Sequence, residues 1–175
     1  MFPLFHIAIP LIIFEIPYIK KKVKINRFAL IVGSILPDII DKSLLFIARL
    51  GNGRYICHTL FYLFTSFLLI LVFNKLLVYT KISNKIKNIY TIPISFLIGT
   101  SLHLLLDLPS IPLFYPFVEY DFTPIGNELF FWLKRILTNP FYFFSEVFGL
   151  IIFIFIILNN KLYTFKDVWS YLILS

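Results

Sequence analysis

The stretch Gly99–Ser110, GTSLHLLLDLPS, places a histidine and an aspartate inside an otherwise apolar run. His103 and Asp107 are four residues apart, so on a helix their side chains point to nearly the same side. A charged group inside a membrane segment costs several kcal/mol unless it is paired or bound, roughly 2.5–3.5 kcal/mol on insertion scales. The pair therefore predicts a functional polar site enclosed by apolar helices.

The composition is typical of a membrane protein. Of the 175 residues, 59% are hydrophobic and 14% are charged, and the mean hydropathy is +0.90. Soluble domains carry about 25% charged residues. We therefore predict an all-α, multi-pass membrane protein with about four to five transmembrane helices, forming a single integral membrane domain over residues 1–175.

Five apolar segments carry this prediction. They are Phe2–Ile19, Phe28–Leu50, Cys57–Tyr79, Tyr90–Leu108 and Phe143–Leu158. A membrane span needs about 20 apolar residues, so the third and fourth segments are the clearest spans. The first contains three prolines and is expected to be short or kinked, and Pro37 predicts a break in the second. The tail 162–174 is expected to lie along the membrane surface.

The basic residues alternate between the loops. Loop 20–27 carries five of them and region 75–88 carries four, whereas loops 50–56 and 109–142 are poor in them. The positive-inside rule then places the first two in the cytoplasm and the last two outside. The N-terminus is predicted to be extracytoplasmic, in the cell membrane.

The net charge of +7 does not indicate nucleic-acid binding, because the basic residues sit in short loops and no polar module remains to form a groove. The single cysteine, Cys57, excludes an intramolecular disulfide and a cysteine-based zinc cage. The extracytoplasmic loop 109–142 could form an interfacial helix over 127–137. Such a helix would serve either as a cover for the site or, as we favour, as an aromatic anchor in the membrane interface.

On this topology the three histidines and four of the nine acidic residues collect on the outer side, whereas Glu15 lies toward the inner half. These candidate metal ligands are His6, Asp38, Asp41, His58, His103, Asp107 and Glu146. Imidazole and carboxylate together suit zinc, manganese or non-haem iron. Catalytic zinc uses about three protein ligands and an open position, so the set suffices for one ion, or for two ions that share a carboxylate.

Structural roles are the alternatives for these residues. His103 and Asp107 could be a hydrogen-bonded pair within the bundle, and Asp38 could begin a helix after Pro37 with Lys42 as its partner. His6 and His58 could be interfacial histidines. Glu146 could favour a helix dipole.

Four motifs resemble the family of membrane-bound metal-dependent hydrolases, also described as LexA-binding, inner-membrane-associated hydrolases. The motifs are GSILPDIID (33–41), RYICHTL (54–60), GTSLHLLLDLPS (99–110) and LFYPF (113–117), and the similarity covers about residues 1–120. The resemblance assigns the site to His6, Asp38, Asp41, Arg54, His58, His103 and Asp107, with Glu146 matching a glutamate of some relatives. Gly53 stands where many relatives have a histidine, and Thr59 replaces a serine.

The residues and the resemblance together predict a metal-dependent hydrolase. A phosphoester of a membrane lipid or lipid-linked molecule fits the position, with Arg54 holding the phosphate. Asp41 or Asp107 is the expected general base. A transporter or metal-handling protein, and a scaffold with a structural metal, are the alternatives.

Overall fold

The computed structural model describes residues 3–50, 52–79, 89–122, 134 and 137–173, and every regular element in these ranges is a helix. The elements are α1 (Pro3–Glu15), α2 (Pro17–Lys22), α3 (Arg27–Ala48), η1 (Ile56–His58), α4 (Leu60–Tyr79), η3 (Ile89–Thr91), α5 (Ile92–Asp107), α7 (Pro140–Asn159) and α8 (Phe165–Ile173). The all-α fold class is thus confirmed. The interfacial helix expected over 127–137 and most of region 75–88 lie outside the described residues.

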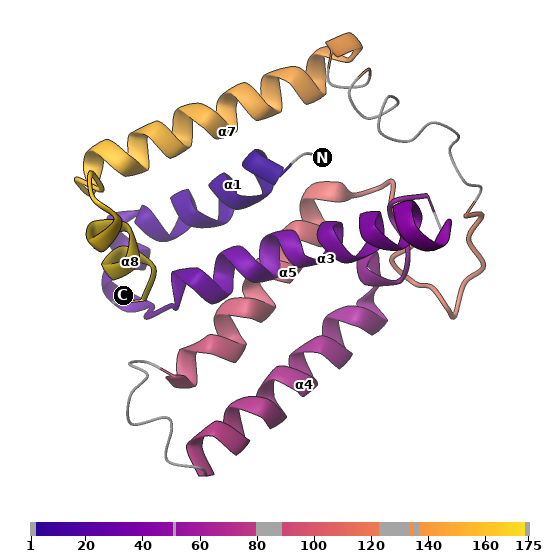
Figure 1. Ribbon diagram of the computed structural model, residues 1–175, viewed down its shortest axis with the longest axis horizontal. Coiled ribbons are helices and arrows are strands. Elements are labelled where there is room, and N and C mark those ends of the chain that lie inside the picture. The colour runs from indigo at the N-terminus through magenta and orange to yellow at the C-terminus, as the bar shows by residue number, and fades with distance from the viewer. Residues whose placement is uncertain (1–2, 51, 80–88, 123–133, 135–136, 174–175) are drawn as a thin grey trace.

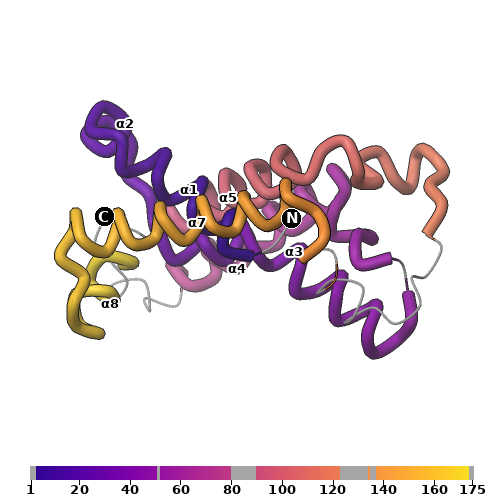
Figure 2. The backbone as a smooth tube through the Cα atoms, turned by 90° about the horizontal axis from the view of Figure 1, so that it is seen from above, coloured from indigo at the N-terminus to yellow at the C-terminus, as the bar shows by residue number. Residues whose placement is uncertain are grey.

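The helices α3 and α5 form the centre of the molecule, and the others pack around this pair. Figure 1 shows α1 beside α3, α7 along the outer side of α1, and α4 beside α5. The short α8 returns to the end where α1 finishes and α3 begins. Viewed from above, α2 extends at one end of the molecule and the segment that follows α5 extends at the other (Figure 2).

Two glycines allow α3 and α5 to approach with their backbones in contact. A Cβ atom at Gly33 would collide with the carbonyl of Phe96, and one at Gly99 would collide with the carbonyl of Leu30. Small residues permit this close approach between membrane helices, where van der Waals packing replaces the hydrophobic effect. The crossing fixes the positions of the polar side chains that follow on both helices.

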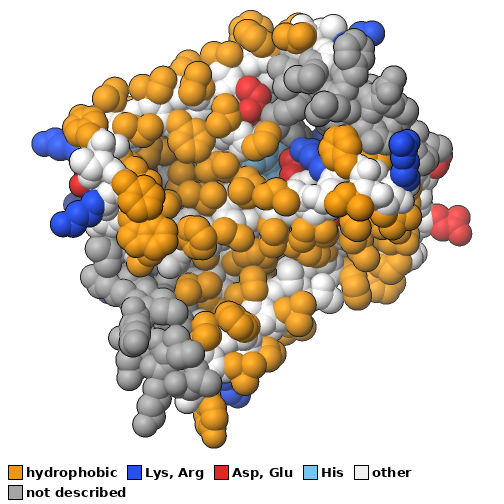
Figure 3. Space-filling view, in the orientation of Figure 1, with side chains coloured by type: hydrophobic (Ala, Val, Ile, Leu, Met, Phe, Trp, Pro, Cys, Tyr) orange, Lys and Arg blue, Asp and Glu red, His pale blue; other side chains and the backbone are white. Residues whose placement is uncertain are grey.

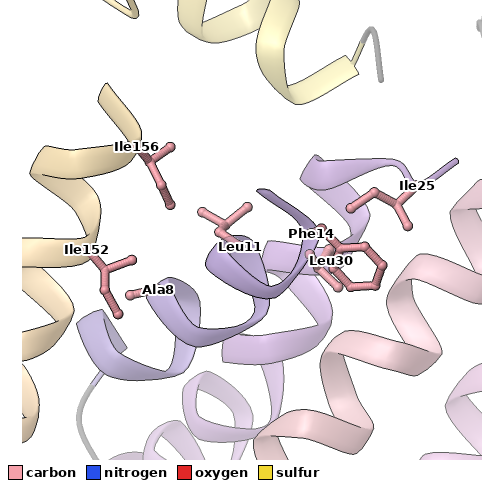
Figure 4. Packing of buried hydrophobic residues seen from close by; sticks show 7 residues of the cluster. All are labelled: Ala8, Leu11, Phe14, Ile25, Leu30, Ile152 and Ile156. Carbon is pink, nitrogen blue, oxygen red and sulfur yellow. The ribbon is translucent and has the colours of Figure 1, made fainter. Parts of the chain in front are cut away.

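A second contact joins the first helix to the last long one. Ala8 and Leu11 of α1 lie against Ile152 and Ile156 of α7, and all four are buried (Figure 4). A Cβ atom at Gly149 of α7 would meet the α1 backbone, so this pair is also closely packed. The helix that carries His6 is thereby held against the bundle on both sides.

Within the part of the chain that the structure describes, two helices are long and apolar enough to cross a membrane, namely α4 and α7, each of 20 residues. Of α4, only Leu63, Ser66 and Asn74 are buried. The hydrophobic side chains that the protein leaves exposed cover much of the face in Figure 3. A surface this apolar suits contact with lipid rather than with water.

The helices α1 and α5 are shorter apolar helices of 13 and 16 residues, and α3 carries three charged residues in its second half. The number of four to five spans therefore stays a prediction. The tail contains the helix α8, over Phe165–Ile173, and its position along the membrane surface stays a prediction.

The break expected at Pro37 is wrong, because α3 runs without interruption from Arg27 to Ala48. Proline has no N–H group, so the carbonyl of Gly33, four residues earlier, has no donor from that position. The hydroxyl of Thr100 on α5 donates to this carbonyl at 3.2 Å. A neighbouring helix thus supplies the missing hydrogen bond, as is common for prolines in membrane helices.

Candidate metal centre

Four buried side chains converge where α3, η1 and α5 meet. They are Asp38, His58, His103 and Asp107, and each offers a ligand atom within 4.8 Å of the others. Both histidines are completely buried, and the two aspartates are nearly so. Figure 3 shows pale-blue histidine surface next to an acidic side chain, in a gap of the otherwise hydrophobic face. These residues form a group that could hold a metal ion.

The ring of His58 is oriented by Asp41. One carboxylate oxygen of Asp41 lies 2.6 Å from Nδ1 of His58 and also accepts from the backbone N–H of Tyr55, at 2.6 Å. The other oxygen accepts from the backbone N–H of Cys57, at 3.1 Å. Because an ionised carboxylate only accepts hydrogen bonds, Nδ1 of His58 carries the proton and Nε2 faces the cluster with its lone pair.

The ring of His103 has the same orientation for a different reason. Its Nδ1 donates to the backbone carbonyl of Ser34 on α3, at 2.8 Å. A carbonyl can only accept, so in the neutral ring the Nε2 atom again carries the lone pair. Histidine ligands of metals are commonly held in this way, by a carboxylate or by a backbone carbonyl on the second nitrogen.

The two lone pairs therefore face each other. The Nε2 atoms of His58 and His103 are 3.1 Å apart. The Nε2 atom of His58 also lies 3.5 Å from Oδ1 of Asp38 and 3.4 Å from Oδ2 of Asp107, and that oxygen is 3.9 Å from Nε2 of His103. With both rings neutral these four atoms are all acceptors, and they repel one another unless a proton on His58 or a metal cation lies between them.

The spacing of these atoms suits a small divalent cation. Zinc binds nitrogen and oxygen at about 2.0–2.2 Å, which places the ligands of a tetrahedral site about 3.3–3.6 Å apart. Four of the six separations within the group, at 3.1–3.9 Å, lie close to this value, and all six are within 4.8 Å. Two imidazoles and two carboxylates also match the donor types that zinc, manganese and iron accept.

Asp107 is held from the opposite side by Arg54. The Nη2 atom of Arg54 lies 3.2 Å from Oδ1 of Asp107, while Nη1 donates to the hydroxyl of Ser110 and, at 3.2 Å, to its backbone carbonyl. Arg54 is itself buried. The arginine predicted to clamp an anion therefore contacts the cluster directly and is not solvated.

His6 lies at the edge of the cluster. Its Nε2 atom is 3.6 Å from Oδ1 of Asp107, and its ring centroid is 4.4 Å from that of His103. The ring is completely buried. His6 thus belongs to the same polar region, although it is not one of the four convergent residues.

Glu146 is placed elsewhere. Its carboxylate accepts from the backbone N–H groups of Leu4 and Phe5, at 3.2 and 3.3 Å, in the first turn of α1. A carboxylate at a helix N-terminus satisfies free N–H groups and interacts favourably with the helix dipole. Glu146 therefore secures the helix that presents His6. The alternative interpretation placed it at the dipole of its own helix, whereas it caps the N-terminus of α1.

Asp38 keeps the partner that the sequence indicated. The Nζ atom of Lys42, one turn further along α3, donates to Oδ2 of Asp38 at 2.7 Å, while Oδ1 faces His58. The carboxylate is thus shared between a lysine and the cluster. It lies in mid-helix and not at a helix start.

Two contributors to the site were not identified from the sequence. The carbonyl of Ser34 has no side-chain signal, because its role depends on the crossing of α3 and α5. Ser110 lies at the end of the motif 99–110. It could have been recognised as a partner of Arg54 only if the segment before η1 and the segment after α5 were known to be in contact.

The comparisons agree with the membrane character of the fold. No curated protein and no solved structure matches the chain. Residues 1–173 match the YdjM inner membrane protein family, whose description names a location and no reaction. The match extends over nearly the whole chain and includes every residue of the cluster. The chain therefore belongs to the YdjM inner membrane protein family.

Proposed function

We propose that this protein is a membrane-bound, metal-dependent hydrolase that acts on a phosphoester of a lipid or lipid-linked molecule. The observation that carries the proposal is the pair of inward-facing Nε2 atoms of His58 and His103, with two carboxylates completing the group. The orientation of each ring is enforced by a separate hydrogen bond. Two histidines with a purely structural role would not need both rings to be fixed in this way.

A single divalent ion, with zinc as the best fit, is the cofactor that the residues favour. Two ions would need a second group of ligands, for which His6 beside Asp107 is the candidate. The guanidinium of Arg54 already lies on the same oxygen of Asp107. Its positive charge opposes a second cation at that point.

Different residues of the chain would contribute to different parts of the hydrolysis. A bound divalent cation would supply Lewis acidity, polarising a phosphoryl oxygen and acidifying water. Asp41 is engaged by three donors and keeps His58 oriented, so the role of proton acceptor falls to Asp107. Asp38, His58 and His103 would then be the three ligands, with the fourth position open to water. A guanidinium has five N–H donors, and Arg54 commits only two of its nitrogen atoms to Ser110 and Asp107. The remaining donors suit a phosphoryl oxygen.

An apolar pocket next to the cluster supports a lipid substrate. It has a volume of about 250 Å³ and is lined by residues of the segment 108–120, including Leu108, Ile111 and Tyr115. This segment begins directly after Asp107, and its Ser110 contacts Arg54. A phosphate at Arg54 could thus keep an attached apolar chain in this pocket.

The proposed topology has the N-terminus and loop 109–142 outside and loop 20–27 in the cytoplasm. The cluster and the basic residues of α2 belong to different ends of the helices. Asp38 follows the first residue of α3, Arg27, by 11 positions, or about 16 Å of helix, and His103 and Asp107 lie in the last turns of α5. These positions support a site in the outer half of the membrane.

The test is hydrolysis of phospholipids by the purified, zinc-loaded protein in mixed micelles. We expect release of a phosphorylated headgroup or of phosphate, loss of this activity in His58→Ala, and a lower kcat/KM in Arg54→Gln. Lys21→Gln, which removes an exposed charge far from the cluster, is the matched control. A metal-loaded protein that turns over no lipid phosphoester would refute the proposal and favour a metal-handling role.

A further inference from the structure

A second polar pocket lies at the end of the bundle remote from the metal cluster. It has a volume of about 450 Å³ and is formed where α2, α3, the end of α7 and α8 come together. Its lining residues are Lys20, Arg27, Asn160, Lys161, Leu162, Asp167, Ser170 and Tyr171. Figure 3 shows basic side chains gathered at this end, in contrast to the apolar face beside it.

The floor of the pocket is built around one buried acid. Glu15, the last residue of α1, accepts from Nη2 of Arg27 at 3.1 Å and from Nζ of Lys20 at 2.7 Å. The hydroxyl of Tyr171 on α8 donates to it at 2.8 Å, and Asn160 does so at 3.3 Å. Burial raises the pKa of the Tyr171 phenol above its usual range, so this hydroxyl stays protonated. Glu15 thus connects the end of α1 to α2, α3, α8 and the end of α7.

This network holds the Arg27 side chain in place but does not use all of its N–H donors. Its Nη1 donates to the carbonyl of Tyr171 at 3.2 Å, and its guanidinium lies 4.2 Å from the centre of the Tyr171 ring. The side chain is 6% exposed, and its Nε–H group is buried with no acceptor among the described residues. Buried N–H groups of a cation normally have a partner, so this donor indicates a missing acceptor.

Two further side chains on the pocket wall have hydrogen-bond donors available to a ligand. Lys161 adopts a left-handed backbone conformation, with φ of 53°, immediately after α7. Neither its ammonium group nor the hydroxyl of Ser170 has a hydrogen bond or ion pair within the described part of the chain. Both are donors that a ligand oxygen could satisfy.

The carboxylates at the pocket do not offset this excess of donors. Glu15 lies beneath the lining with its side chain only 2% exposed. Asp167 turns one oxygen to Thr164, accepting from its backbone N–H at 3.0 Å and from its hydroxyl at 2.7 Å, as a cap of α8. Of the three cationic side chains that line the cavity, Lys20 and Arg27 are paired with Glu15, which leaves the ammonium group of Lys161 without a counter-ion among the described residues.

We propose that this pocket binds the phosphate group of an anionic ligand, through Arg27, Lys161 and Ser170. Phosphate oxygens accept several hydrogen bonds at once and favour arginine and lysine donors. The ligand is either an anionic lipid headgroup or free phosphate, since basic pockets between membrane helices on the cytoplasmic side recognise lipid headgroups of this kind. This binding is independent of the metal cluster and of any hydrolytic activity.

The experiment measures ligand binding by the full-length protein in neutral detergent, with two probes in separate arms. The probes are inorganic phosphate and a short-chain phosphatidylglycerol, with a short-chain phosphatidylcholine as the zwitterionic comparison. We compare the wild type with Lys161→Gln and Ser170→Ala, which lose no internal contact. The controls are Lys21→Gln and Lys166→Gln, which each remove one exposed positive charge outside the pocket.

We expect saturable binding that falls about tenfold in Lys161→Gln, as is typical of a hydrogen bond to a charged group, and changes less than about twofold in the controls. Binding of phosphatidylglycerol alone identifies a lipid headgroup, and binding of inorganic phosphate identifies the free anion. If neither probe binds, or if all three lysine variants weaken binding equally, the proposed pocket is refuted. The zinc content of these variants should match the wild type, which separates this result from any failure of the metal centre.

Discussion

The Nε2 atoms of His58 and His103 lie 3.1 Å apart, although the two residues are 45 positions apart in the sequence. In their neutral forms both rings present a lone pair at this contact, because Nδ1–H donates to Asp41 in His58 and to the carbonyl of Ser34 in His103. Two such acceptors in contact are unfavourable unless a proton or a metal cation lies between them. The relationship between these two atoms is thus the basis of the proposed metal centre.

Asp41 is expected to tune the metal site through His58. The variant Asp41→Asn keeps the shape of the side chain but removes the charge that fixes the ring. Loss of such a supporting carboxylate typically weakens metal binding about 10- to 100-fold. Titration with a chelating indicator should give this reduction, with Ile39→Ala, on the exposed side of α3, as a control. An unchanged affinity would show that Asp41 does not orient a ligand.

The glycine contact between α3 and α5 is expected to govern both stability and the site. In Gly99→Ala the new methyl group meets the carbonyl of Leu30, and overpacking of this kind costs about 1–3 kcal/mol. Separation of the helices would also move His103 away from the carbonyl of Ser34. We expect a lower melting temperature together with weaker metal binding, whereas Ile94→Ala on the exposed side of α5 should change neither. A Gly99→Ala protein with the wild-type melting temperature would contradict the close approach.

The end of the bundle remote from the cluster depends on Glu15. In Glu15→Gln the buried guanidinium of Arg27 loses its counter-ion, and breaking a buried pair typically costs about 3–5 kcal/mol. We expect a clear loss of thermal stability in detergent, measured against Lys21→Gln. A stability equal to that of the control would show that α8 is not held through this ion pair.

The orientation in the membrane is tested by labelling of single cysteines. In a Cys57→Ser background, Glu119→Cys should react with an impermeant reagent in intact cells, and Lys22→Cys should react only after the cells are opened. Both positions are exposed, so access depends on the side of the membrane. Labelling of the Lys22→Cys variant from outside would reverse the proposed topology.

Sequence reasoning located the helices well because each depends on a local pattern. All five apolar segments contain a helix whose ends lie within a few residues of the expected ones. The error at Pro37 arose because the missing hydrogen bond comes from Thr100, which is 63 residues away and close only in the folded protein.

The candidate site could likewise be predicted from the sequence only in part. The spacing of His103 and Asp107 was sufficient to predict that both reach one polar group. The spacing of Asp38 and Asp41 did not reveal that the two carboxylates lie beside opposite nitrogens of the same ring, His58. That division of roles depends on η1, which places the ring between them. The contact of Glu146 with α1 likewise depends on the packing of α7 against that helix.

The central claim is tested most directly by the metal content of the purified protein, measured together with its melting temperature for the wild type and for His103→Ala. We predict about one divalent ion per wild-type chain, and less than about a tenth of that in the variant, with the variant still inserted in the membrane. Wild-type protein that holds no metal after growth in zinc would contradict the account. So would a His103→Ala protein with full metal content and a much lower melting temperature, because His103 would then stabilise the bundle without binding an ion.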